Sequence, residues 1–186
     1  MATQQLKPEG WSKVLERLRG KHVLITGTTG FLGKVVLEKL IRAVPDIGGI
    51  HLLIRGNKRH PNARERFFDE IATSSVFDRL RQDDNEAFET FIDERVHCVT
   101  GEVTEPLFGL SADRFRKLAG GIDVVINSAA SVNFREELDK ALAINTQCLE
   151  NVAELARQNK SLAVLQVSTC YVNGMNSGQI TETVIK

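Results

Sequence analysis

A short apolar run followed by three evenly spaced glycines is the feature that most restricts how this chain can fold. Residues 23–25, Val-Leu-Ile, have the length and composition of a buried parallel strand. The glycines follow at once, with two residues between each: Gly27, Gly30 and Gly33. Apolar residues then recur with helical spacing over residues 31–44, and Pro45 ends the pattern. The sequence therefore predicts a strand, a tight glycine turn and a helix in immediate succession.

A strand, a glycine turn and a helix in this order are typical of a dinucleotide-binding turn. Phosphate groups bind the bare backbone N–H groups at the start of such a helix. Gly27 would allow the tight turn, Gly30 the close approach of a pyrophosphate, and Gly33 the close packing of helix on strand. The spacing, with Phe31 and Leu32 between the last two glycines, resembles that of the extended short-chain dehydrogenase/reductase superfamily.

Four further apolar runs predict strands, and helical patterns separate them. These strands cover residues 50–54, 96–100, 123–127 and 162–168, and a long helix covers about 136–158. Alternating strands and helices predict an α/β fold, a doubly wound parallel sheet of the Rossmann type that stops after its fifth strand. A ligand would then bind at the carboxyl ends of the strands.

Two segments extend this simple plan. Residues 1–20 are predicted to be a lead-in with an amphipathic helix at residues 12–19 that begins at Ser12 as its N-cap. We expect this helix to pack on its own domain, the alternative being a membrane surface. Residues 21–186 form the predicted Rossmann domain, in which residues 56–95 are longer than a simple crossover requires. We predict a helical insertion there, with three short helices near residues 67–71, 77–80 and 88–92.

Composition excludes several classes of function. The 24 basic and 24 acidic residues give a formal net charge of 0, which does not favour binding to nucleic acid. The three cysteines have no ligand-like spacing to histidine, which predicts reduced thiols and no metal site. No apolar run approaches the roughly 18 residues that span a bilayer, so we expect no transmembrane segment. The N-terminus has no signal-peptide core, and a cytoplasmic protein of undetermined oligomeric state is expected.

The residue after the second predicted strand indicates which nicotinamide cofactor binds. NAD-specific Rossmann folds usually place a carboxylate there, which accepts a hydrogen bond from the ribose 2′-hydroxyl. This chain has Arg55 at that position. A guanidinium would bind a 2′-phosphate through paired charge-assisted hydrogen bonds, whereas a carboxylate would repel it. The sequence therefore favours NADPH, the alternative being an arginine that only covers the strand end.

Several segments in order resemble one family. They are residues 26–33, 52–55, 101–103, 106–111, 127–134, Asn145 and residues 167–174. Together they resemble the reductase domain of fatty acyl-CoA reductases, the male-sterility group of the extended short-chain reductases, and especially its bacterial, Marinobacter-type members that make fatty alcohols. The resemblance covers nearly the whole chain from Gly20 onward, and the long insertion fits it.

The resemblance implies a role for many residues at the predicted strand ends. The expected cofactor-binding residues are Thr26, Gly27, Thr29, Gly30, Phe31, Leu32, Gly33, Arg55, Gly101, Glu102, Val103, Asn127, Ala129 and Ala130. Glu102 stands where the family usually has Asp. Thr169 is the expected catalytic hydroxyl, which would bind the substrate carbonyl oxygen, and Ser168 is the second choice. Asn145 is expected to brace the active site from the long helix.

The polar residues among these also have purely structural interpretations. Asn127 could be a turn residue at a strand end, and Asn145 could make a hydrogen bond inside a helix. Hydroxyl side chains at strand ends, such as those of Ser168 and Thr169, commonly cap turns.

One part of the implied chemistry has no match in the sequence. The superfamily uses the tyrosine of a Tyr-x-x-x-Lys helix as proton donor, but Tyr171 is the only tyrosine, and Met175 stands four residues later. We therefore interpret the chain as the amino-terminal, cofactor-binding part of a longer enzyme. That enzyme would reduce long-chain fatty acyl-CoA to aldehyde or alcohol with NADPH, and the 186 residues alone are expected to be inactive.

Other functions remain open for the same motifs. A thioester reductase domain that acts on carrier-bound acyl groups would use the same cofactor logic. A non-catalytic NADP(H)-binding module would use the fold without the chemistry. A nucleotide-sugar epimerase is a weaker alternative, because residues 56–95 and 108–111 do not fit it.

Overall fold

Five parallel strands form a single sheet in the order β3-β2-β1-β4-β5. The computed structural model describes residues 9–181, apart from the side chains of residues 9–12, 170 and 173. The strands are β1 (His22–Thr26), β2 (Gly49–Ile54), β3 (Val96–Thr100), β4 (Val124–Asn127) and β5 (Ala163–Gln166). The strand order reverses between β1 and β4, so the switch point lies at their carboxyl ends, where such folds bind ligands. The predicted doubly wound Rossmann-type sheet is confirmed.

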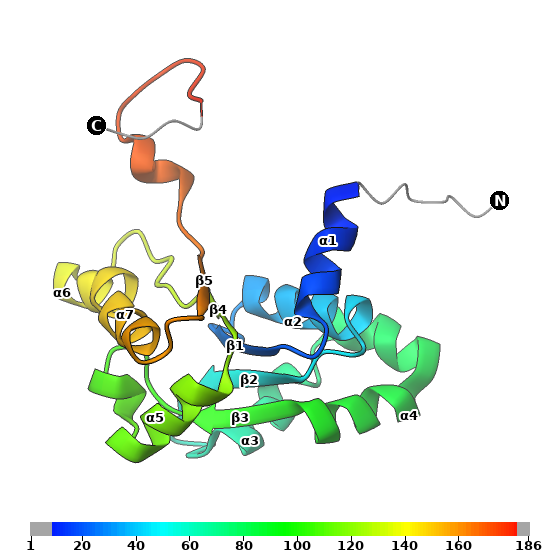
Figure 1. Cartoon of the computed structure of the whole chain (residues 1–186). Helices are drawn as coiled ribbons and strands as arrows, with labels where there is room; N and C mark the ends of the chain where they lie inside the picture. Colours follow the sequence, from blue (N-terminus) through cyan, green and yellow to red (C-terminus); the bar gives the residue numbers. More distant parts are fainter. Residues whose placement is uncertain (1–8, 182–186) are drawn as a thin grey trace.

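Helices cover both faces of the sheet (Figure 1). The first face packs against α2 (Phe31–Ala43), α3 (Ala63–Arg66) and α4 (Asp78–Arg95). The second packs against α5 (Ala112–Gly121) and α7 (Leu149–Gln158). Successive side chains of a strand point to opposite faces, so in β1 Leu24 enters the second core and Ile25 the first. Both are fully buried, which explains the continuous apolar run.

The insertion between β2 and β3 is helical, as expected, but its helices are joined differently. The π-helical turn η1 (Phe67–Ile71) continues directly from α3, and the short 3₁₀ turn η2 (Ser75–Phe77) leads into α4. The second and third predicted helices are both parts of α4, which is kinked at Asp84. The carboxylate of Asp84 accepts a hydrogen bond from the backbone N–H of Ala87 at 3.0 Å, so it starts a new helical turn at the kink.

The N-terminal helix α1 (Glu9–Leu18) begins earlier than predicted. Because Glu9 is already helical, Ser12 lies inside the helix, and its prediction as the N-cap is wrong. Leu15 and Leu18 pack against the first core, whereas Val14 is exposed. The side chain of Trp11, near the start of this helix, lies outside the described residues. The described part of the helix therefore packs on its own domain, as expected.

Two predicted elements in the last third of the chain differ from expectation, the long helix because it is divided and the fifth strand because it is shorter. The long helix is divided into α6 (Leu138–Leu142), the π-helical turn η4 (Ala143–Gln147) and α7. Strand β5 ends at Gln166, so Ser168 does not belong to it. The reason is that its partner β4 ends at Asn127, whose carbonyl accepts the last ladder hydrogen bond, from Val167 N–H at 3.0 Å. Beyond this point the chain rises away from the sheet (Figure 1).

Candidate functional site

The glycine turn between β1 and α2 leaves no room for a side chain at Gly27 or Gly33. Gly27 has a φ of +75°, and a Cβ there would lie 2.8 Å from the backbone of Ser128 and Ala129. A Cβ at Gly33 would lie 2.7 Å from the carbonyl carbon of Gly27, so α2 approaches the turn as closely as backbone allows. Gly30 precedes α2 without a side-chain cap, and the N–H groups of the first helical turn stay open to a ligand.

A buried hydrogen-bond network joins the ends of β1, β4 and β5 beneath this turn. The Thr26 hydroxyl donates to Asn127 Oδ1 at 2.6 Å and accepts from the N–H groups of Ser128 and Ala129, both at 3.1 Å. Asn127 Nδ2 donates to Gln166 Oε1 at 2.7 Å. Thr26 and Asn127 are both buried, so these bonds fix the backbone that follows β4 from inside the protein. Sequence reasoning did not identify Gln166.

Thr28 is a further residue of the turn that sequence reasoning did not select. Its side chain is buried, yet its hydroxyl has no hydrogen-bond partner; among residues 9–181 no other buried side-chain oxygen or nitrogen is in this state. Buried polar groups without a partner are rare, because each costs about 1–3 kcal/mol. A turn with bare glycines, an uncapped helix start and an unused hydroxyl fits a dinucleotide.

The remaining predicted residues of the turn lie at its surface. Thr29 and Gly30 are exposed, and so are the aromatic ring of Phe31 and the side chain of Leu32. The helical periodicity that includes Phe31 and Leu32 is therefore not a sign of burial at the start of α2. Its buried members lie further along the helix, for example Leu37 and Ile41.

Arg55 and Glu102 meet where β2 and β3 end. Ile54 pairs with Thr100 in the register of the two strands, and Gly101 N–H donates to the Ile54 carbonyl at 3.2 Å. The next residues outward, Arg55 and Glu102, form an ion pair with 3.3 Å between Nη1 and Oε2. The arginine predicted to bind a 2′-phosphate therefore already has a carboxylate partner.

A strained turn supports this strand end. In the 3₁₀ segment η3 (Pro106–Gly109), Leu107 has a φ of +53° and Phe108 a φ of +58°, both in the left-handed region. Each residue other than glycine in the left-handed region costs about 1–2 kcal/mol of folding free energy. The Phe108 carbonyl accepts a hydrogen bond from Glu102 N–H at 2.9 Å, and a Cβ at Gly101 would lie 2.6 Å from the same oxygen.

Asn151, on α7, holds the strained turn in place. Its Oδ1 accepts from Leu107 N–H at 2.8 Å, and its Nδ2 donates to the carbonyls of Val103 at 3.0 Å and Glu105 at 2.8 Å. Asn151 is buried, so these bonds are shielded from water. The turn that carries Gly101, Glu102 and Val103 is thus fixed by a residue that lies more than forty positions away in the sequence and carries no local signal.

Asn145 lies in the π-helical turn η4 and holds the loop that follows β4. Its Oδ1 accepts from Ser131 N–H at 2.8 Å, and its Nδ2 donates to the Ser131 carbonyl at 3.1 Å. The Ser131 hydroxyl in turn donates to Glu136 Oε2 at 3.0 Å. Both ends of the Asn145 amide are therefore used to fix the segment that begins with Ala129 and Ala130.

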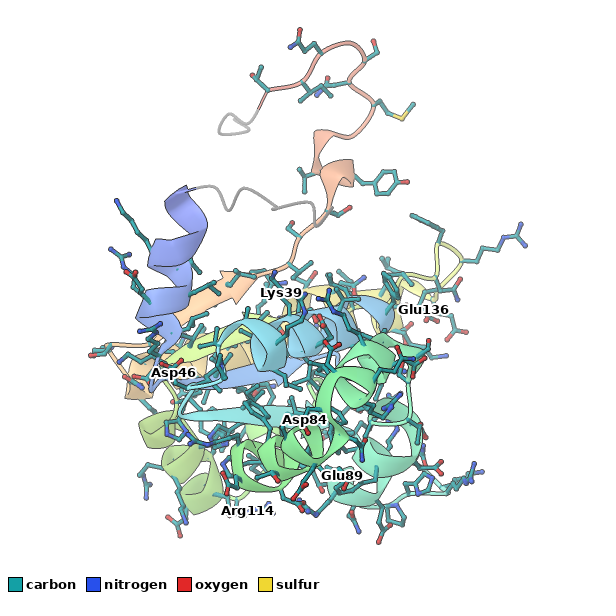
Figure 2. All side chains as sticks on the ribbon, turned by 90° about the vertical axis from the view of Figure 1, so that its right-hand side faces the viewer. Lys39, Asp46, Asp84, Glu89, Arg114 and Glu136 are labelled. Carbon is teal, nitrogen blue, oxygen red and sulfur yellow. The ribbon has the colours of Figure 1, made fainter. Side chains whose placement is uncertain are left out.

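Ser168 and Thr169 lie on the segment that rises from the end of β5. Both are exposed. Thr169 caps the short turn η5 (Cys170–Asn173), and its hydroxyl accepts a hydrogen bond from Tyr171 N–H at 3.2 Å. The Tyr171 ring makes an edge contact with Phe134, with 5.6 Å between the ring centroids. In Figure 2 the side chains of this segment project away from the body of the molecule.

Two further observations concern metals and thiols. Within the described ranges there is no group of three or more His, Cys, Asp and Glu residues that could hold a metal ion. Burial raises the pKa of the Cys98 thiol to about 11, and burial also raises the pKa of Cys148. Both thiols are therefore protonated at neutral pH and poor nucleophiles. In residues 9–181 there is also no helix with the length and apolar character needed to cross a membrane.

Sequence comparison relates the chain to a known family. Residues 25–186 match the NAD-binding family described as Male sterility protein. The chain is 40% identical over 170 residues to the chloroplastic fatty acyl-CoA reductase 2 of Arabidopsis thaliana, which covers 91% of this chain and 27% of that protein. It is 35% identical over 176 residues to the alcohol-forming fatty acyl-CoA reductase of Simmondsia chinensis, covering 94% of this chain and 36% of that protein. The chain spans about a third or less of the length of these relatives.

Solved structures with a similar fold include reductase domains of peptide synthetases. The terminal R domain of the myxalamid PKS-NRPS pathway has 27% identity and a TM-score of 0.61, over 82% of this chain and 35% of that one. The R domain of a nonribosomal peptide synthetase from Mycobacterium tuberculosis has 27% identity and a TM-score of 0.62, over 90% and 38%. These matches agree with the family resemblance seen in the sequence.

Proposed function

The chain belongs to the NAD-binding family described as Male sterility protein, and from its site we propose that it carries the NADPH-binding part of a fatty acyl-CoA reductase. The observation that carries the proposal is the glycine turn at the switch point, whose tightly packed backbone leads into a helix start without a side-chain cap, so that N–H groups are open to a pyrophosphate. The similarity to named fatty acyl-CoA reductases supports an acyl thioester as the substrate class.

The residues that would hold the cofactor form a row along the carboxyl edge of the sheet. Gly27, Gly30 and the first turn of α2 would receive the pyrophosphate. Arg55 would bind the 2′-phosphate, and the backbone at Gly101–Val103 would face the adenine. Ala129 and Ala130, with their small side chains, would leave room for the nicotinamide ribose. When bound, NADPH would supply the hydride for the carbonyl carbon.

Thr169 is the proposed donor to the substrate carbonyl oxygen. In its bond to Tyr171 N–H the hydroxyl acts only as an acceptor, so its own proton is free to be donated. A donor at this oxygen would stabilise the negative charge that develops when the thioester is reduced. The product would be an aldehyde, or an alcohol after a second reduction. Asn145 would act as a positioning residue through the loop at Ser131.

A second candidate is a thioester reductase domain that acts on carrier-bound acyl groups. The similarity to the R domains of peptide synthetases favours this reading. The two candidates share the cofactor site and differ in what presents the acyl group. Binding of long-chain acyl-CoA, compared with the same acyl group on a carrier protein, separates them.

Titration of the purified chain with NADPH and NADH tests the cofactor assignment. We expect NADPH to bind at least about tenfold more tightly, because a charge-assisted bidentate contact contributes about 1.5–3 kcal/mol. Arg55→Asp should weaken NADPH binding far more than NADH binding, and equal losses for both would refute the assignment. Failure of the wild-type chain to bind either cofactor would refute the proposed function.

Addition of acyl-CoA to the NADPH complex tests the substrate and the expected inactivity. We expect palmitoyl-CoA, but not free CoA, to change the fluorescence of bound NADPH. No NADPH should be consumed, because the 186 residues contain no Tyr-x-x-x-Lys pair. Steady oxidation of NADPH by the chain would contradict the expected inactivity. Equal responses to palmitoyl-CoA and free CoA would count against a fatty acyl substrate.

A further inference from the structure

We propose that Glu102 sets the preference of this site between NADPH and NADH by competing with the 2′-phosphate for Arg55. The inference rests on the proposed function, because it concerns the same cofactor site. It starts from the ion pair between the Arg55 guanidinium and the Glu102 carboxylate, 3.3 Å apart. A phosphate that binds Arg55 must share or displace that carboxylate.

The two partners of the ion pair differ in how firmly they are held. The Arg55 side chain is 67% exposed, whereas that of Glu102 is 22% exposed. Glu102 Oε1 also accepts a hydrogen bond from Thr104 N–H at 3.4 Å, and Glu105 N–H donates to the Glu102 carbonyl at 3.1 Å. The Glu102 carboxylate is therefore the less exposed partner and has a second hydrogen bond, whereas the Arg55 guanidinium is the more exposed partner.

The backbone of Glu102 is held by a strained turn. Its N–H is bound to the carbonyl of Phe108, which lies in the left-handed region together with Leu107. Asn151 holds that turn through three hydrogen bonds to its backbone. Strained residues persist where the surroundings over-determine them, and they cluster at functional sites. The strained turn fixes the backbone of Glu102 beside Arg55, the residue that directly follows β2.

The backbone of Arg55 is fixed from the insertion side. Its carbonyl accepts a hydrogen bond from Arg66 Nη1 at 2.7 Å, and Arg66 Nε is paired with Glu70 at 2.9 Å. Hydrogen bonding to Arg66 and Asn57 lowers the pKa of Glu70, so this support stays charged at neutral pH. The Arg55 backbone is thus anchored, while its exposed guanidinium could contact a ligand phosphate as well as Glu102.

The charges predict opposite effects on the two cofactors. The dianionic 2′-phosphate would lie within a few ångströms of the Glu102 carboxylate and be repelled by it, which lowers the affinity for NADPH. The ribose 2′-hydroxyl of NADH could donate to the same carboxylate, which raises the affinity for NADH. Glu102 therefore narrows the preference for NADPH that Arg55 creates.

The experiment measures binding of 2′,5′-ADP and 5′-AMP as well as the two cofactors, because these nucleotides probe the subsite without any reduction. The variants are Glu102→Gln, Glu102→Asp, Arg55→Met and the double variant. Glu154→Gln is the matched control, because its carboxylate pairs with Arg157 on the surface of α7, away from this strand end. Thermal unfolding of each variant checks that it remains folded.

We expect Glu102→Gln to tighten 2′,5′-ADP and NADPH binding about tenfold. About threefold of this comes from removing the repulsion by one charge about 6 Å away at the dielectric constant of water, and the rest comes from ending the competition for Arg55. It should weaken NADH binding severalfold, and Glu102→Asp should lie between. In the Arg55→Met background the gain for NADPH should fall to about threefold, because the competition is gone and only repulsion remains. Glu154→Gln should change neither ratio.

Two results would overturn the inference. If Glu102→Gln leaves the NADPH-to-NADH ratio unchanged, or weakens NADPH binding, the carboxylate only positions Arg55 or supports the loop. If the wild-type chain binds none of the four nucleotides, the proposed function fails together with this inference. Because the first result requires measurable binding, the two failures are distinguishable.

Discussion

The two ends of the candidate site are built in different ways. At the switch point, a buried hydrogen bond from the Thr26 hydroxyl to Asn127 Oδ1 joins β1 and β4, and Gly27 and Gly33 pack directly against backbone atoms. Beyond β5, Thr169 and Tyr171 are exposed and are held by a few local contacts, and β5 itself is exposed along its whole length. Substitutions at the first end should therefore alter stability and cofactor binding together. Substitutions at the second end should act locally.

The largest effect is expected for Gly33→Ala. The added Cβ would overlap the carbonyl of Gly27, and both partners are backbone that cannot rotate away. We expect a loss of about 3–5 kcal/mol in the free energy of unfolding and a large loss of NADPH affinity. Urea unfolding and NADPH titration measure the two quantities. Gly30→Ala is the matched control for the stability measurement only, because its Cβ would lie 3.3 Å from the same oxygen. Equal losses of stability for both variants would show that close packing of α2 is not the cause.

Two threonines in the same turn allow a sharper test of the buried network. Thr26→Val removes a hydroxyl that makes three hydrogen bonds, and it leaves the N–H groups of Ser128 and Ala129 without a partner. We expect a loss of about 2–4 kcal/mol in the free energy of unfolding. Thr28→Val removes a hydroxyl that has no partner, and it should be neutral or stabilising by about 1 kcal/mol. Denaturant unfolding of both variants tests this. A loss in Thr26→Val alone would assign the stability to the hydrogen bonds, whereas equal losses would show that any substitution in this region is destabilising.

Cofactor binding by the Thr28 variant adds a second readout. If the unused hydroxyl serves the pyrophosphate, Thr28→Val should weaken NADPH binding about five- to tenfold while leaving the free chain no less stable. Unchanged affinity would mean that Thr28 has no part in binding.

The elements of the fold could be predicted because their periodicity is local. Strand β3 was predicted with both its ends correct, and β1 with its buried run, since apolar runs between turn residues are visible in the sequence. The errors are at element ends. Ser12 resembled a cap although the helix had already begun, and β5 was predicted too long because its end depends on its partner β4.

The interior of the site could be predicted only in part, because its contacts join residues far apart in the sequence. The glycines are visible in the sequence because their spacing is local. The bonds of Asn151 to the η3 turn, of Gln166 to Asn127, and of Glu102 to Arg55 depend on the tertiary fold. The left-handed conformation of Leu107 and Phe108 has no sequence signal either, since neither residue favours it.

A cluster of three histidines lies toward the amino ends of the strands, opposite the candidate site. We expect it to have an effect on stability that is intermediate between those of the two ends of the site. His22, His51 and His97 lie on three adjacent strands, with 3.3 Å between His22 Nδ1 and His51 Nε2 and 5.0 Å between the ring centroids of His51 and His97. Burial, together with the neighbouring imidazoles, lowers the pKa of His51 from 6.5 to about 4. Between these values the unfolded chain binds more protons than the folded one, so stability falls as the pH falls from 6.5 toward 4.

We expect this histidine to account for about 2 kcal/mol of that loss, since one pKa unit corresponds to about 1.4 kcal/mol and partial exposure reduces the effect. Urea unfolding between pH 7 and pH 4 measures it. His51→Leu should flatten the dependence, and His60→Gln, which removes a histidine bonded to Asp69 elsewhere, should not. A slope that persists in His51→Leu would assign the loss to other groups. Cofactor binding at neutral pH should be the same in both variants, because this edge lies opposite the site.

The smallest effect on stability is expected at the exposed end of the site. Phe134 is exposed apart from its edge contact with Tyr171, so Phe134→Ala should lower the free energy of unfolding by no more than about 0.5 kcal/mol. Its effect should be local. The Tyr171 N–H, which is bonded to the Thr169 hydroxyl, should exchange with solvent severalfold faster once η5 loses its aromatic contact.

Amide hydrogen exchange at Tyr171 measures this loosening, with Val132→Ala as the control because Val132 is equally exposed on the same loop. A global loss above about 1 kcal/mol would show that the loop after β4 belongs to the cooperative core. Unchanged exchange at Tyr171 would show that the ring contact does not hold η5. The expected combination, local loosening without global loss, would mean that the hydroxyl of Thr169 is positioned by contacts independent of the core that shapes the cofactor end.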